Sequence, residues 1–109
     1  MRMAYVMKFV SDMDAAVAFY RDTLGLPLKF QTPGWSEFAT GETTLALHIA
    51  SAENSAGACE LGFSVEDIQA FHAAKSAEGM VFPRPPKEEH GVMLATFLDC
   101  EGAPVSVSG

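Results

Sequence analysis

The sequence is short of cysteine, of basic side chains and of long apolar runs. Its two cysteines, Cys59 and Cys100, form no CxxC pair, which excludes a disulfide scaffold and a structural zinc site. Seven basic against fourteen acidic side chains give a formal net charge of −7, which argues against nucleic acid or an anionic membrane as a partner. No run approaches the roughly 18 apolar residues of a membrane span, and residues 1–10 lack the pattern of a signal peptide. We therefore expect a protein of the reducing cytoplasm.

The apolar content of the chain is sufficient for one small domain. Hydrophobic residues make up 49% of its 109 residues, which excludes intrinsic disorder, but the length is too short for two independent cores. A domain of this size buries only roughly 65% of its unfolded surface, so it gains from association and we expect a homodimer. The sequence contains no serine elbow, phosphate loop or dinucleotide fingerprint. Those motifs therefore indicate no function here.

An internal repeat organises the chain. Asp12 and Asp67 each precede a helical pattern and lie 55 residues apart, while Gly25 and Gly79 end those patterns 54 residues apart. The spacing predicts a single domain over residues 1–109, built from module one at about 1–52 and module two at about 58–109.

Each module is predicted to contain a strand, a helix and three further strands. The first helix is expected to begin at a capping box of Ser11 and Asp14 and to end at Gly25. The second helix is expected between Asp67 and Gly79. Strands are expected at residues 5–10, 28–30, 35–38, 43–49, 60–65, 80–82, 92–98 and 104–107.

The stretch 82–91 is rich in proline and charge and is interpreted as an exposed connection, or alternatively as a lid. One helix cannot cover both faces of a four-stranded sheet, so each module leaves one face open. Pairing the open faces of two modules would enclose a cavity for a ligand.

The motifs at the two ends of the chain resemble a known family. They are Val10-Ser11-Asp12-Met13-Asp14, Phe19-Tyr20, Leu24-Gly25-Leu26 and Phe97-Leu98-Asp99-Cys100-Glu101-Gly102. Together they resemble the vicinal oxygen chelate superfamily, which includes glyoxalase I, bleomycin-resistance proteins, extradiol dioxygenases and fosfomycin-resistance enzymes. The resemblance implies an α+β fold in which two tandem βαβββ modules form a curved mixed sheet around a cavity.

The resemblance also implies four metal-ligand positions, which fall on Tyr5, Ala46, Glu60 and Ser106. Only Glu60 is a strong ligand for a divalent cation, because alanine has no donor and neutral serine or tyrosine coordinates poorly. We therefore expect no cofactor. The alternative is a divalent metal ion held by Glu60 and by His48, which lies two residues after Ala46 on the same strand face.

The other candidates are aromatic and sulfur side chains on the strands. Tyr5 and Met7 share a face with period two, and Trp35 follows Pro33-Gly34 at the start of a strand, where an indole can cap a planar or cationic group. Such residues are also ordinary core fillers. The expected ligand-binding residues are Tyr5, Met7, Trp35, His48, Glu60, Phe97 and Ser106.

Three functions remain open. The first is a metal-independent protein that binds a small apolar or cationic organic molecule, similar to the bleomycin-resistance branch. The second is a divergent metal-dependent lyase, isomerase or dioxygenase acting on vicinal oxygens. In the third, Glu60 acts as a catalytic acid or base without a metal. Whether the protein is an enzyme is left open by these residues.

Overall fold

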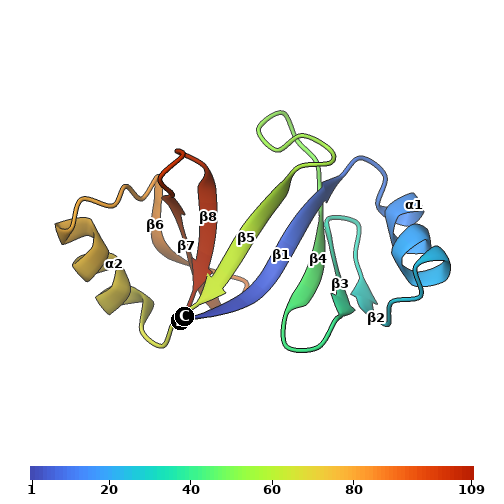
Figure 1. Ribbon diagram of the computed structural model, residues 1–109, viewed down its shortest axis with the longest axis horizontal. Helices are drawn as coiled ribbons and strands as arrows, with labels where there is room; N and C mark the ends of the chain where they lie inside the picture. The colour runs from blue at the N-terminus through green and yellow to red at the C-terminus, as the bar shows by residue number, and fades with distance from the viewer. The chain divides into compact units, whose positions relative to one another are not determined.

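The sequence repeat is also a repeat of structure. A computed structural model describes residues 1–109. They divide into two compact units, one formed by residues 4–60 and the other by residues 1–3 and 61–109. Each half contains one four-stranded mixed sheet and one α-helix that packs on it (Figure 1). The predicted α+β fold of two βαβββ modules is confirmed.

Module one contains the elements up to β4. They are β1 (Arg2–Val10), α1 (Met13–Ala18), the π-helical turn η1 (Phe19–Thr23), β2 (Leu28–Gln31), β3 (Trp35–Ala39) and β4 (Thr44–Ile49). Its sheet has the order β2-β3-β4-β1, in which β1 and β4 are parallel and the other pairs are antiparallel.

Module two repeats this arrangement. Its elements are β5 (Cys59–Ser64), α2 (Ile68–Ala77), β6 (Arg84–Glu89), β7 (Val92–Leu98) and β8 (Pro104–Ser108). The order β5-β8-β7-β6, with β5 and β8 parallel, matches that of module one element by element.

Both helices begin in the same way. The Asp12 carboxylate accepts a hydrogen bond from the Ala15 backbone N–H at 3.0 Å, and Asp67 accepts one from Ala70 at the same distance. The predicted cap at Ser11 was therefore wrong by one residue. A carboxylate in extended backbone is an equally good cap, because it accepts from the unpaired N–H groups of the first turn.

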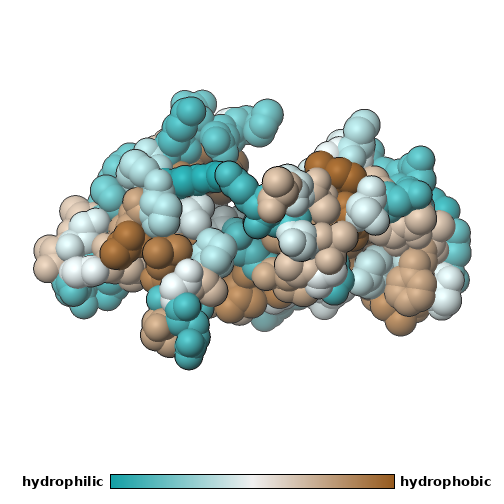
Figure 2. Space-filling model, turned by 90° about the horizontal axis from the view of Figure 1, so that it is seen from above, coloured by the Kyte–Doolittle hydropathy of each residue, from teal (hydrophilic) through white to brown (hydrophobic).

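The first helix ends in a π-helical turn that the apolar pattern does not predict. The Leu24 N–H bonds to the Phe19 carbonyl five residues back, and this wider turn rotates later side chains out of the helical stripe. Leu24, which follows the turn, is consequently 56% exposed. Figure 2 shows apolar patches between the hydrophilic areas of the surface. In the same turn Arg21 donates two hydrogen bonds to Asp22, which lower the pKa of that carboxyl.

The third strand of module two lies later than predicted. Residues 80–82 are not a strand, and the proline-rich stretch is β6 rather than a loop or lid. Proline is tolerated there because β6 pairs only with β7 and because Pro85 and Pro86 fall within a register shift between Arg84 and Lys87. A two-residue turn of His90 and Gly91 then joins β6 to β7.

Each helix covers one face of its own sheet and forms the main core there. In module one, Met13 and Val17 of α1 pack against buried Phe38 and Leu47. The equivalent cluster of module two consists of Ile68, Ala95 and Val107, with Phe63, Val65, Phe71, Phe82, Met93 and Phe97 around it. No helix is long and apolar enough to cross a membrane.

Candidate functional site

Module one carries an aromatic face on the side of its sheet opposite α1. Strand register defines it, because residues paired directly across neighbouring strands point to the same side. One row consists of Phe9, His48 and Trp35, and the next of Met7, Ala46 and Glu37. With Tyr5, which lies two residues before Met7, these seven residues are here called the aromatic face.

The rings of the aromatic face pack edge to face. The Trp35 ring lies 5.9 Å from Tyr5 and 5.8 Å from His48, measured between ring centroids, and both contacts are close to perpendicular. Tyr5 and Trp35 come from rows on either side of Ala46, which is fully buried. The alanine methyl leaves space into which these two larger rings converge.

Glu37 is the one carboxylate of this face. Its Oε2 accepts a hydrogen bond from Trp35 Nε1 at 2.8 Å, which fixes the indole plane against the strand. Lys29 Nζ lies 3.9 Å from the other carboxylate oxygen and donates instead to Thr44 Oγ1 at 3.0 Å. The negative charge of Glu37 is therefore only partly offset.

The His48 side chain is oriented by its own backbone neighbour. Its Nδ1 lies 2.7 Å from the Ile49 carbonyl oxygen, and its ring contacts Phe9 at a centroid distance of 5.4 Å. Because a carbonyl oxygen only accepts, Nδ1 carries the hydrogen and the other ring nitrogen is left for a different partner.

The residues at the implied metal positions of module one do not fit a metal ion. Ala46 offers no donor atom, and the neutral phenol of Tyr5, whose ring is packed against Trp35, is a poor ligand for a divalent cation. No three histidine, cysteine, aspartate or glutamate side chains gather into a group that could hold a metal.

The two equivalent positions of module two share one sheet face. Ser106 pairs with Gly62, and Glu60 lies two residues before Gly62 on β5. The Ser106 side chain is 8% exposed and Glu60 is half-buried. Ser106 lies on the side of its sheet away from α2, because the adjacent Val107 is in the helix-side core. The ligand role of Ser106 stays a prediction. The acid–base role of Glu60 stays a prediction.

The structure brings together only some of the predicted ligand-binding residues. Four of them lie on the aromatic face: Tyr5, Met7, Trp35 and His48. Met7 is buried, as are Phe9 and Ala46 of the same face. Phe97 is placed differently. It lies on the helix side of module two, 6.1 Å from the Phe71 ring and 6.0 Å from Phe82, so it is a core side chain.

Sequence reasoning missed Glu37 as a candidate. The available signal was its position two residues after Trp35 on the same strand, which places the indole and the carboxylate on one face. What the sequence did not reveal was the hydrogen bond between them.

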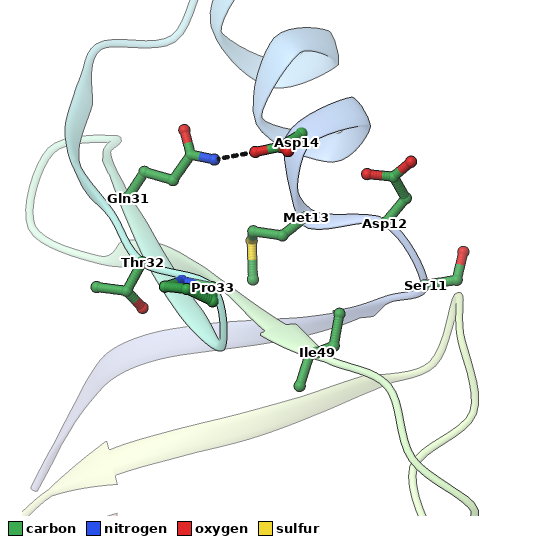
Figure 3. Close-up of a pocket in the computed structure, with 8 residues that line it drawn as sticks. All are labelled: Ser11, Asp12, Met13, Asp14, Gln31, Thr32, Pro33 and Ile49. Atoms are coloured by element: carbon green, nitrogen blue, oxygen red, sulfur yellow. Dashed lines mark hydrogen bonds between the residues drawn. The ribbon is translucent and has the colours of Figure 1, made fainter.

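A separate hollow of about 670 Å³ lies in module one beside the start of α1 (Figure 3). Three of its polar side chains already have partners, since Gln31 donates to Asp14 at 2.7 Å and Asp12 caps the helix. The α1 helix has only six residues, and its first turn is satisfied by Asp12. We therefore place the candidate site on the aromatic face.

Comparison with known proteins agrees with the fold. The family model of the Glyoxalase/Bleomycin resistance protein/Dioxygenase superfamily matches residues 2–107, and the chain belongs to this superfamily. No curated protein matches the sequence.

Solved structures of the same fold have low sequence identity to the chain. Methylmalonyl-CoA epimerase from Mycobacterium tuberculosis has a TM-score of 0.83 at 16% identity, covering 97% of this chain and 85% of the epimerase. The epimerase of Streptomyces coelicolor, solved with 2-nitronate-propionyl-CoA, has a TM-score of 0.80 at 19% identity, with 99% and 93% covered. A hypothetical protein from Bacillus halodurans has a TM-score of 0.82 at 16% identity, with 98% and 92% covered. At these identities the likeness concerns the fold alone.

Proposed function

We propose that this protein binds a small planar organic cation on the aromatic face of module one, without a metal ion. The observation that carries the proposal is the pairing of Trp35 with Glu37, an indole held in place by a partly exposed carboxylate. An indole attracts a cation to its π face, and a neighbouring carboxylate adds direct charge attraction.

The chemistry of the surrounding residues supports this ligand class. Tyr5 and His48 stand nearly perpendicular to the Trp35 ring and add aromatic contacts beside it. The formal net charge of −7 favours the approach of a cation over that of an anion. Metal independence is supported by Ala46, which supplies no donor at an implied ligand position.

We further propose that the protein acts as a cytoplasmic homodimer. Support comes from the small size of the domain, which gains stability by burying additional surface. Sedimentation measurements test the oligomeric state independently of ligand binding.

Trp35 allows a direct test, because it is the only tryptophan of the chain and its fluorescence reports this face alone. We expect N-methylquinolinium to change Trp35 emission and to bind more tightly than quinoline, which has the same ring system and is neutral at neutral pH. Glu37→Gln keeps an oxygen for the indole N–H but removes the charge, so it should weaken N-methylquinolinium binding by about tenfold. Isothermal titration calorimetry gives the dissociation constants.

The matched control is Glu42→Gln, an equal charge change at an exposed position in the turn between β3 and β4. It should leave the affinity for N-methylquinolinium unchanged. Equal binding of the cation and of quinoline, or no binding of either, contradicts the proposal. Equal loss of affinity in both variants would assign the effect to overall charge.

A further inference from the structure

We infer that the cation bound on the aromatic face carries N–H donors, and that His48 Nε2 and the Glu37 carboxylate accept hydrogen bonds from them beside the Trp35 indole. This inference rests on the proposed function and adds to it the chemical class of the charged group. Amidinium, guanidinium and protonated amino-heteroaromatic groups belong to that class and should bind more tightly than quaternary ammonium or N-alkylated ring cations, which carry no N–H.

The first acceptor follows from the tautomer of His48. Its Nδ1 is within 2.7 Å of the Ile49 carbonyl oxygen, which accepts hydrogen bonds and donates none. In the neutral imidazole the hydrogen is therefore on Nδ1, and Nε2 presents a lone pair. The ring contacts with Phe9 and Trp35 hold the imidazole on the aromatic face.

The second acceptor is the Glu37 carboxylate. Two carboxylate oxygens offer about four acceptor positions, of which Trp35 Nε1 uses one. Lys29 Nζ is 3.9 Å from Oε1, too far for a hydrogen bond. The carboxylate therefore has acceptor capacity left for a ligand donor.

Strand register places the two acceptors beside the same indole. His48 is paired with Trp35 across β3 and β4, and Glu37 follows Trp35 by two residues on β3. A cation stacked on Trp35 and lacking N–H groups would remove water from both acceptors without replacing its hydrogen bonds. A cation with N–H groups replaces them with charge-assisted hydrogen bonds.

The test compares two quinolines with the same ring system and charge. At neutral pH, 4-aminoquinoline is protonated and carries N–H donors, whereas N-methylquinolinium carries none. We expect calorimetry to give about tenfold tighter binding of 4-aminoquinolinium to the wild-type protein. His48→Phe, which keeps an aromatic ring, and Glu37→Gln should each reduce that preference severalfold.

His72→Phe is the matched control for the histidine variant, because His72 lies on α2 of module two with its ring against Phe82. It should retain the full preference, and thermal unfolding establishes that all variants fold. Equal affinity of the two cations for the wild type overturns this inference and leaves the proposed function standing. A preference that persists in both His48→Phe and Glu37→Gln also overturns it. If neither cation binds, both proposals are overturned.

Discussion

Phe97 and Trp35 are both aromatic residues on strands, yet strand register gives them opposite surroundings. Trp35 shares a face with His48 on the side away from α1, whereas Phe97 pairs with Val105 and packs toward α2. An alternating sequence pattern separates the two faces of a strand but does not identify which one the helix covers. This ambiguity explains why alternation alone groups Phe97 with Trp35, whereas strand register separates them.

The placement of Phe97 in the core can be tested separately from ligand binding. We expect Phe97→Leu to lower the free energy of unfolding by about 1–2 kcal/mol, because it removes ring contacts with Phe71 and Phe82. Urea denaturation measures this change. The dissociation constant for N-methylquinolinium should stay the same, and a selective loss of affinity at unchanged stability would return Phe97 to the ligand site.

At the scale of elements, the hairpin from β6 to β7 depends on backbone conformation at its turn. His90 and Gly91 both have positive φ, 53° and 83°, as a two-residue turn of type I′ requires. A Cβ at Gly91 would meet no atom within 4 Å, so Gly91→Ala alters only the backbone preference. We expect that change to cost about 1 kcal/mol in the free energy of unfolding.

Gly34→Ala is the matched control for that substitution. Gly34 also has open space around its Cβ position, but its φ is outside the left-handed region. The midpoint of thermal unfolding should fall for Gly91→Ala and stay the same or rise slightly for Gly34→Ala. A fall of equal size in both variants would contradict the assignment of the strain to the turn.

Most elements were predictable because their signals are local. Aspartates before the helices, glycines after them and period-two strands placed both α-helices and seven of the eight strands. The eighth strand, β6, was missed because its prolines indicated a loop. Proline disfavours a strand only where its position must donate a hydrogen bond to the neighbouring strand, and Pro85 and Pro86 lie where the register shifts. The π-helical turn at Phe19 was missed because an i+5 bond leaves no pattern in apolar spacing.

At the scale of the molecule, the candidate site was predicted in part. The sequence placed three residues of the aromatic face among the predicted ligand-binding residues: Tyr5 by alternation and an implied metal position, Trp35 by the preceding Pro33-Gly34, and His48 by its position two residues after Ala46. Glu37 was not among them, since its role depends on a hydrogen bond to Trp35 that only the folded strand shows. Pairing of strands distant in sequence decides which of these side chains meet, and that pairing is what sequence periodicity leaves undetermined.

The proposed metal independence depends on the whole donor set and gives the last prediction. Ala46 lacks a donor and the neutral phenol of Tyr5 coordinates poorly, so half of the implied positions supply no strong ligand. We expect that adding excess Ni²⁺ or Zn²⁺ does not shift the midpoint of thermal unfolding, and that adding a chelator does not shift it either. An ion stabilises the folded state only if it binds to that state. Glu60→Gln is the decisive variant. Stoichiometric metal binding that is lost in Glu60→Gln would contradict the prediction and favour the metal-dependent enzyme that the resemblance also allows. Weak metal binding that is retained in Glu60→Gln would arise from other surface groups.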